Sequence, residues 1–192
     1  MEQISEQKAM LRSRLRKARR EMDREILNRD SWQLCARLLA LPELQQANSV
    51  FCYVSCGGEV ETHRLIETLL GQGKQVLVPR CKGDGVMDCV PITSLAQLVP
   101  GKMGIAEPPA ELAAAAPKTV AFAVIPAVAC GEDGSRLGQG GGYYDRFLQK
   151  AACAHAAVCL ESFLLPSVPA EPHDQTMKCI VTQHRVLRFE EV

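Results

Sequence analysis

The stretch GSRLGQGGGYYDRFL, residues 134–148, decides how the rest of this sequence is interpreted. Five of its first nine residues are glycine. Because glycine loses more conformational freedom on folding than other residues, such a cluster indicates that something approaches the backbone closely. The apolar segment 118–126 before it predicts a strand, and the amphipathic segment 143–154 predicts a helix. The sequence therefore predicts a strand–loop–helix unit with the glycines at the start of the helix.

This predicted unit has the properties of an anion site. A helix N-terminus carries free N–H groups and a partial positive charge, and glycines let a phosphate come close to several of them. Arg136 adds a planar fork suited to phosphate oxygens, and Asp145 in the first helical turn is placed to reach a magnesium ion on a polyphosphate. The alternative is a flexible surface loop in which Asp145 only favours the helix dipole.

Neither standard phosphate motif is present in the loop. It lacks the GxxxxGK[ST] pattern, and a GxGxxG pattern starting at Gly138 fails because Tyr143 stands where the last glycine belongs. Spacing alone therefore predicts an anion site on a strand–loop–helix unit and does not identify the anion.

Apolar segments that alternate with amphipathic ones predict the fold class. The predicted strands are residues 49–55, 74–80, 85–92, 118–126, 155–161 and 178–183, and the predicted helices between them are 62–73 and 143–154. This alternation favours an α/β fold with a mainly parallel sheet that helices cover on both faces. The length of 192 residues predicts one domain over residues 1–192.

Residues 1–44 form a predicted N-terminal helical arm. It consists of a helix over 4–28 and a second helix over 31–44, with Asp30 or Ser31 as the N-cap of the second. Four residues at helical spacing form an apolar stripe on the first helix: Leu11, Leu15, Ala18 and Met22.

A second face of the first helix is basic and carries Lys8, Arg12 and Arg16 at four-residue spacing. This face can be a solvated surface, a nucleic-acid contact or a polyphosphate clamp. The formal net charge of zero and the 5% of aromatic residues argue against nucleic acid.

The composition also limits the environment of the protein. No apolar run is long enough for a membrane span, and the first twenty residues lack the apolar core of a secretion signal. We therefore expect a cytoplasmic protein that binds no membrane. The nine cysteines form no CxxC pair, which favours reduced thiols serving as small buried hydrophobes over a zinc site.

Three further carboxylates are candidate ligands. Glu59 and Glu61 follow the predicted strand 49–55, at the end where α/β sheets bind ligands, although a solvated pair at a helix start has the same pattern. Asp174 lies in a proline-flanked loop beside His173, where a simple turn residue is the alternative to a ligand.

Six blocks, in order along nearly the whole chain, resemble the 5-formyltetrahydrofolate cyclo-ligase family, also called 5,10-methenyltetrahydrofolate synthetases. The blocks are KAMLR (8–12), YVSCGGEVETHRLI (53–66), VLVPR (76–80), MGIAEPP (103–109), VIPAVACGEDGSRLGQGGGYYDRFL (124–148) and VPAEPHD (168–174). One glycine loop would be weak support for a family, but six blocks in sequence order are strong support.

The resemblance implies a fold similar to the sugar-isomerase and coenzyme A transferase-like proteins. It also implies a ligase of one-carbon metabolism that uses MgATP to convert 5-formyltetrahydrofolate into 5,10-methenyltetrahydrofolate, with release of ADP and phosphate. The implied path runs through phosphorylation of the formyl oxygen. We expect the protein to be a monomer. The alternative functions are another nucleotide- or sugar-phosphate-using α/β enzyme or a nucleic-acid-binding module.

The resemblance also implies roles for single residues. Lys8 and Arg12 would bind ATP phosphates, Asp145 and Asp174 would hold Mg²⁺, and Arg136 and Tyr143 would be catalytic. The nucleotide would be wrapped by Arg136, Leu137, Gly138, Gln139, Gly140, Gly141, Gly142, Tyr143 and Tyr144. The folate would be contacted by Val54, Glu59, Gln139 and Tyr143. Gln139 and Gly141 depart from the basic residues that some relatives carry at these positions.

Overall fold

The computed structural model describes residues 2–101 and 104–189, and its centre is a seven-stranded sheet in the order β12-β11-β9-β6-β1-β2-β3. The bounds are β1 Ser49–Cys52, β2 Gln75–Gly83, β3 Val86–Ile92, β6 Phe122–Pro126, β9 Ala154–Val158, β11 Cys179–Val181 and β12 Val186–Arg188. The strands from β11 to β2 are parallel, and the edge strands β12 and β3 are antiparallel to their neighbours. Met103, which opens the block 103–109, lies outside the described residues.

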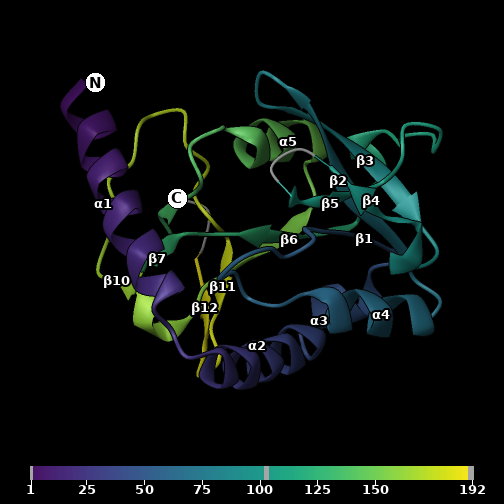
Figure 1. Cartoon of the computed structure of the whole chain (residues 1–192), viewed down its shortest axis with the longest axis horizontal. Coiled ribbons are helices and arrows are strands. Elements are labelled where there is room, and N and C mark those ends of the chain that lie inside the picture. Colours follow the sequence, from purple (N-terminus) through teal and green to yellow (C-terminus); the bar gives the residue numbers. More distant parts are fainter. Residues whose placement is uncertain (1, 102–103, 190–192) are drawn as a thin grey trace.

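Helices cover both faces of this sheet (Figure 1). Helices α2, α3 and α4 pack on one face, α5 packs on the other, and α1 lies along one side of the molecule. Their bounds are α1 Glu2–Arg20, α2 Arg24–Leu39, α3 Pro42–Gln46, α4 His63–Gly71 and α5 Tyr143–Ala151. This arrangement confirms the predicted α/β class with a mainly parallel sheet. Among the described helices, none combines the length and the apolar character needed to cross a membrane.

Short strands and turns complete the fold. They are β4 Val99–Pro100, β5 Ala106–Glu107, β7 Ala129–Gly131, β8 Arg136–Leu137 and β10 Leu164–Leu165, with 3-10 turns η1 Leu95–Gln97, η3 Pro117–Thr119 and η4 Glu161–Phe163. Strands β10, β7 and β8 form a small separate sheet. The glycine-rich stretch therefore contains a short strand, Arg136–Leu137, where the sequence predicted only loop.

The core lies on both sides of the parallel strands. Phe51 and Phe122, on adjacent strands, are almost fully buried, and the ring of Phe147 from α5 stacks on Phe51 with 4.3 Å between centroids. Six of the nine cysteines are buried as well. Burial raises the pKa of Cys35 and of Cys89 to about 12, so these thiols stay protonated and pack as small hydrophobes.

The order in which strands are added to the sheet changes direction at β1. From β1 the chain continues to β2 and β3 on one side, and it then returns to β6 on the other side of β1. In α/β sheets the crevice at the carboxyl ends of two such strands is the usual ligand position. The segments that follow β1 and β6 therefore flank the expected ligand position.

The predicted boundary of the two arm helices is wrong. Helix α1 ends at Arg20, and α2 begins after Asp23. The carboxylate of Asp23 caps α2 by accepting hydrogen bonds from the N–H groups of Glu25 (2.7 Å) and Ile26 (3.1 Å). Asp30 and Ser31 lie buried inside α2, where they accept hydrogen bonds from Gln183 (3.3 Å) and from the Glu61 N–H (3.0 Å). These polar residues serve tertiary contacts, which a local capping pattern does not reveal.

The Asp23 cap gives a testable effect on stability. Replacing Asp23 with alanine is expected to lower the free energy of unfolding by about 1 kcal/mol, because two N–H groups of α2 lose their acceptor. Thermal unfolding followed by circular dichroism measures this as a fall in Tm of roughly 2–4 °C. Glu21→Ala is the matched control, since the Glu21 side chain is exposed and its carboxylate lies 3.9 Å from Nζ of Lys17. An equal Tm for Asp23→Ala and Glu21→Ala would contradict the cap.

Candidate active site

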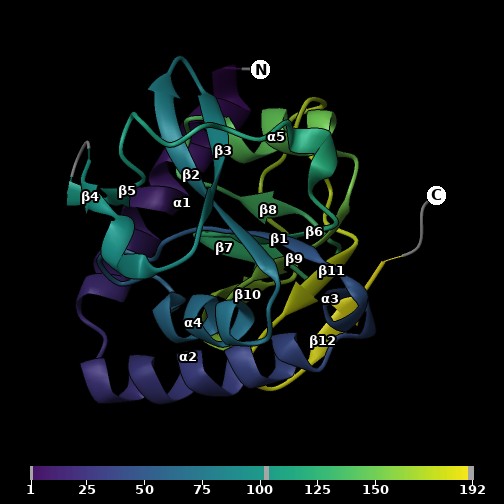
Figure 2. The ribbon, with the colours of Figure 1, turned by 90° about the vertical axis from the view of Figure 1, so that its right-hand side faces the viewer.

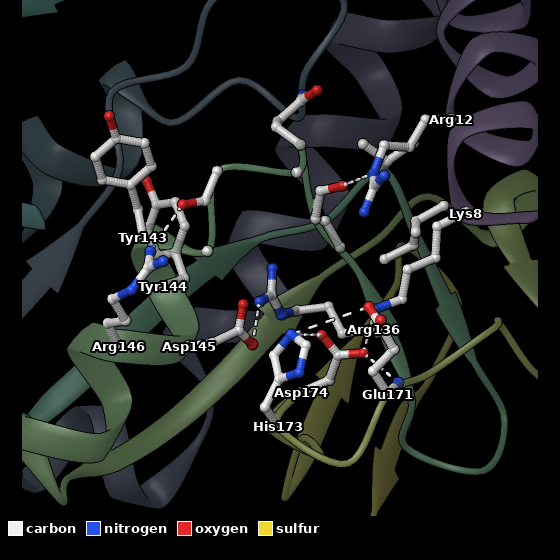
Figure 3. Close-up of a pocket in the computed structure, with 18 of the residues that line it drawn as sticks. Lys8, Arg12, Arg136, Tyr143, Tyr144, Asp145, Arg146, Glu171, His173 and Asp174 are labelled. Carbon is white, nitrogen blue, oxygen red and sulfur yellow. Dashed lines mark hydrogen bonds and ion pairs between the residues drawn. The ribbon is translucent and has the colours of Figure 1, made fainter. Parts of the chain in front are cut away.

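A cavity of about 440 Å³ opens where α1, the segment after β6 and the loop at 171–174 meet (Figure 3). Thirteen of the fifteen residues predicted for the site line it: Lys8, Arg12, Arg136, Leu137, Gly138, Gln139, Gly140, Gly141, Gly142, Tyr143, Tyr144, Asp145 and Asp174. Val54 and Glu59 do not line it. The structure thus brings residues of the N-terminal helix together with two segments from the last third of the sequence at the carboxyl edge of the sheet.

The glycine loop has a backbone conformation that residues with side chains rarely adopt. Gly140 and Gly142 have φ of +103° and +66°, in the left-handed region that favours glycine. A Cβ at Gly138 would lie 2.8 Å from Nη1 of Arg136. Gly142 is the N-cap of α5 and provides no side-chain cap. The first N–H groups of α5 are therefore available to an anion.

Arg136 is held rigidly at the edge of the cavity. Its side chain is only 3% exposed, Nη1 donates to the Pro126 carbonyl at 3.2 Å, and Nη2 donates to Oδ1 of Asp145 at 2.8 Å. Its Nε is buried and has no hydrogen-bond partner among the described residues. The guanidinium is therefore a fixed positive charge rather than a mobile fork, with one donor left unsatisfied.

Lys8 pairs with two carboxylates of the loop at 171–174. Its Nζ lies 2.7 Å from Oε2 of Glu171 and also contacts Oδ2 of Asp174, which accepts a further bond from the Glu171 N–H at 2.6 Å. Burial opposes ionisation of both Lys8 and Asp174. The hydrogen bond and ion pair between them outweigh this effect and raise the pKa of Lys8. The same pair, together with the hydrogen bond from the Glu171 N–H, lowers the pKa of Asp174.

The same loop gathers three side chains that could hold a divalent cation. The ligand atoms of Glu171, His173 and Asp174 lie within 4.8 Å of one another. Carboxylate oxygens are the ligands that Mg²⁺ takes from proteins, together with phosphate oxygens of a substrate. Asp145 adjoins the loop through a bond from the Gln175 N–H at 3.2 Å, and its Oδ1 is shared with Arg136. Sequence reasoning missed Glu171, although it lies three residues before Asp174 in the same quoted block.

The basic face of α1 turns toward the glycine loop and not away from the molecule. Nε of Arg12 donates to the Gly138 carbonyl at 2.8 Å, and Arg16 bonds both the side chain and the carbonyl of Gln139 at 2.9 Å. These contacts favour the polyphosphate clamp over the two other interpretations of this face.

Arg19 continues that face and was not predicted. It is buried, donates to the carbonyls of Ala127 and Val128, the latter at 3.0 Å, and lies over the ring of Phe163. The predicted apolar stripe is thus only partly the packed face, because Ala18 is exposed while Arg19 is buried. Lys8, Leu15 and Arg19 have the spacing of one buried helix face, but the charges of Lys8 and Arg19 hide this pattern.

The residues predicted for the folate side are only partly brought together. Nε2 of Gln139 lies 3.3 Å from Oε1 of Glu59, whose other oxygen accepts from the Cys56 N–H at 3.1 Å. Tyr143 is half-buried and lines the cavity. Val54 is 4% exposed and belongs to the core, so its side chain is not presented to the cavity.

Comparison with known proteins settles the family. The model of the 5-formyltetrahydrofolate cyclo-ligase family matches residues 4–183. The chain belongs to this family. Among cyclo-ligases of this family, a protein from Mycolicibacterium smegmatis is 33% identical over 93% of this chain and 94% of its own length. A probable 5-formyltetrahydrofolate cyclo-ligase from Schizosaccharomyces pombe is 31% identical over 96% of this chain and 99% of its own.

A solved structure extends the comparison to three dimensions. The 5,10-methenyltetrahydrofolate synthetase of Aquifex aeolicus superposes with a TM-score of 0.86 at 29% identity, covering 96% of this chain and 94% of that one. The family resemblance drawn from the six blocks is therefore confirmed. The region matched to the cyclo-ligase family includes every residue placed in the cavity above.

Proposed function

We propose that this protein converts 5-formyltetrahydrofolate and MgATP into 5,10-methenyltetrahydrofolate, ADP and phosphate. The observation that carries the proposal is the convergence of Lys8, Arg12 and Arg136 with the uncapped N-terminus of α5 on one cavity. Phosphoryl transfer depends mainly on positioning and charge neutralisation, and this cavity concentrates both. Membership of the cyclo-ligase family supplies the identity of the second substrate.

The reaction begins when the formyl oxygen attacks the γ-phosphorus of ATP and the bond to ADP breaks. An amide-type oxygen is a poor leaving group, and its phosphorylation makes departure possible. N10 of the folate then attacks the activated formyl carbon and its proton passes to water. The five-membered ring closes as the C–O bond to the phosphorylated oxygen breaks and inorganic phosphate leaves. No side chain has to act as general base in the first step, so positioning and charge are the tasks left to this chain.

The residues divide these tasks by position. Lys8 and Arg12 hold the triphosphate from α1, the N–H groups of Gly140–Gly142 cradle it, and Arg136 faces the transferring group. Magnesium, when bound, neutralises phosphate charge, and the carboxylates of Asp174 and Asp145 are the groups that would hold it. Glu59 and Gln139 contact the folate beside Tyr143, and Val54 supports that side from within the core.

A direct assay tests this function. Purified protein is mixed with MgATP and 5-formyltetrahydrofolate, and the absorbance of the methenyl product is followed with and without ATP and with the magnesium chelated. We expect product only when ATP and magnesium are both present, with one ADP formed for each product. Product that does not depend on ATP, or no product at all, would overturn the proposal.

Two further parts of the proposal concern the state of the protein. We propose that it acts as a monomer in the cytoplasm. Light scattering of the purified protein and fractionation of the source cells test these two statements separately from the activity.

A further inference from the structure

We propose that Arg146 is a positioning residue that locks the β2–β3 hairpin onto the glycine loop, so that the hairpin becomes a working part of the nucleotide site. The catalytic consequence of this lock rests on the proposed function, whereas the lock itself rests only on geometry. Arg146 lies on α5 and lines the cavity, but neither the motif nor the mechanism above gives it a task.

The side chain of Arg146 returns from α5 to the loop that precedes the helix. Its Nη1 donates to the Gly141 carbonyl at 2.9 Å, and Figure 3 shows the guanidinium reaching toward the loop next to Tyr143. Because the donor is charged, this hydrogen bond is stronger than one between neutral groups. It fixes the peptide that leads into Gly142, the left-handed N-cap of α5.

Glycines from two separate elements form the slot that holds this guanidinium. A Cβ at Gly85, in the turn of the hairpin, would lie 1.6 Å from Nη1 of Arg146 and 2.6 Å from the Gly141 carbonyl oxygen. A Cβ at Gly142 would lie 2.8 Å from the same Nη1. Contacts below 3.0 Å do not occur between real atoms of this kind, so the slot exists only because these positions lack side chains.

The hairpin is shaped to reach this slot. Its turn holds three consecutive residues at positive φ: Gly83 at +105°, Asp84 at +51° and Gly85 at +71°. The pairing of β2 with β3 also shifts register between Cys81 and Gly83. Figures 1 and 2 both show the end of the hairpin projecting past the sheet beside α5. The turn therefore carries its backbone directly against Arg146.

The consequence for the site follows from exposure. Arg146 is exposed, so the loss of its side chain removes little buried surface and leaves the folded core intact. The substitution removes the charge-assisted hydrogen bond that holds the glycine loop in one conformation. The N–H groups of that loop then lose their fixed orientation toward the triphosphate. The effect should fall on the KM for MgATP more than on kcat or Tm.

The test compares Arg146→Ala and Gly85→Ala with two controls. Gly73→Ala has a similar φ of +76°, but no atom of the described residues lies within 4 Å of the added Cβ. Lys150→Ala removes another exposed cation from α5. The first two variants should each raise the KM for MgATP about tenfold, and the controls less than about twofold. An unchanged KM in Arg146→Ala, or an equal rise in Gly73→Ala, would overturn the lock.

Chemical rescue makes the test specific to the slot. Millimolar guanidinium chloride should restore most of the affinity for MgATP in Arg146→Ala, because the emptied slot is open to the free ion. It should not do so in the double variant Gly85→Ala/Arg146→Ala, in which the methyl group fills the slot. Equal rescue of both proteins would show that no slot is involved.

Amide hydrogen exchange separates this inference from the proposed function. In the protein without ligands, Arg146→Ala should speed exchange at Gly140–Gly142, while Lys150→Ala should not. If the wild-type protein made no methenyl product but this exchange pattern held, the function would fail and the lock would stand. If wild type were active and exchange at the loop did not change, only the lock would fail.

Discussion

Replacing Arg136 with alanine is expected to lower turnover at saturating MgATP and 5-formyltetrahydrofolate by about a hundredfold. The guanidinium is a buried positive charge fixed by Pro126 and Asp145 at the mouth of the cavity, so it needs no reorganisation when charge develops on the transferring phosphate. Removing one preorganised donor of this kind costs roughly 2.7–4 kcal/mol of transition-state stabilisation. The measurement is kcat from the absorbance of the methenyl product.

The same substitution also changes stability, and a second variant separates the two effects. Without Arg136, the half-buried Asp145 loses its cation, which is expected to cost about 1–3 kcal/mol of unfolding free energy. In Arg136→Ala/Asp145→Asn the unpaired charge is gone, so stability should recover. Because Asp145 is also a proposed magnesium ligand, turnover of the double variant is compared with that of Asp145→Asn alone and should be lower. Equal turnover in these two proteins would mean that Arg136 acts only as a structural support for Asp145.

A matched control is available on the surface. Arg185, like Arg136, is an arginine in an ion pair, here with the carboxylates of Glu132 and Glu161. It is about half exposed and does not line the cavity. Arg185→Ala should leave turnover unchanged, because exposed ion pairs contribute little. Full turnover in a folded Arg136→Ala protein would contradict the assigned role.

The elements that could be predicted from the sequence are those with a local pattern of their own. The parallel strands were predicted because apolar runs of this length stand out between amphipathic helices, and their ends differ from the observed ones by only a few residues. The glycine loop was predicted as an anion site because glycines and a helix start have local physical consequences. The six blocks then supplied the chemistry that spacing alone did not.

The partners of Arg136 could not be predicted in this way. It donates to the Pro126 carbonyl because β8 pairs with β7, which follows β6 directly. Strands of two or three residues, such as β7 and β8, are too short for any periodic pattern. The sequence therefore indicated an arginine for phosphate, but not that two of its nitrogens are held by protein.

The packed face of α1 was hidden for a different reason. Lys8 and Arg19 are buried and bond to carboxylates and carbonyls, respectively, from distant segments. A pattern that assigns charged residues to solvent places these two on the wrong side of the helix. Long-range pairing of buried charge is a tertiary property, so only the folded structure reveals it.

Replacing Lys8 with methionine is expected to raise the KM for MgATP roughly tenfold to a hundredfold. Methionine keeps an apolar stem in a position that is only 5% exposed, so the change removes the charge and little packing. The carboxylates of Glu171 and Asp174 then face the triphosphate without their cation and repel it. Lys17→Met is the control, because Lys17 lies on the same helix with its side chain 78% exposed.

Binding of magnesium without ATP should change in the opposite direction. In the wild-type protein Nζ of Lys8 contacts one oxygen of each of the two carboxylates that would hold a divalent cation. Lys8→Met frees these oxygens, so calorimetry in the absence of nucleotide should detect tighter Mg²⁺ binding than in wild type. Weaker or equal Mg²⁺ binding would place the ion elsewhere, and an unchanged KM for MgATP would remove Lys8 from the phosphate site.

The pH dependence of stability gives the sign of the Lys8–Asp174 interaction. The raised pKa of Lys8 means that its contribution is complete below 10.5, its ordinary value, and is lost as pH rises through the higher folded value. The lowered pKa of Asp174 means that its contribution is complete above 3.8 and is lost as pH falls through the lower folded value. Lys8 also lowers the pKa of Glu171 from its ordinary 4.5, so the contribution of Glu171 is complete above 4.5. The stability difference between wild type and Lys8→Met, from urea unfolding, should therefore be largest and flat between 4.5 and 10.5 and shrink outside these limits. A difference that grows toward acid pH would mean that Lys8 stabilises the fold through something other than these carboxylates.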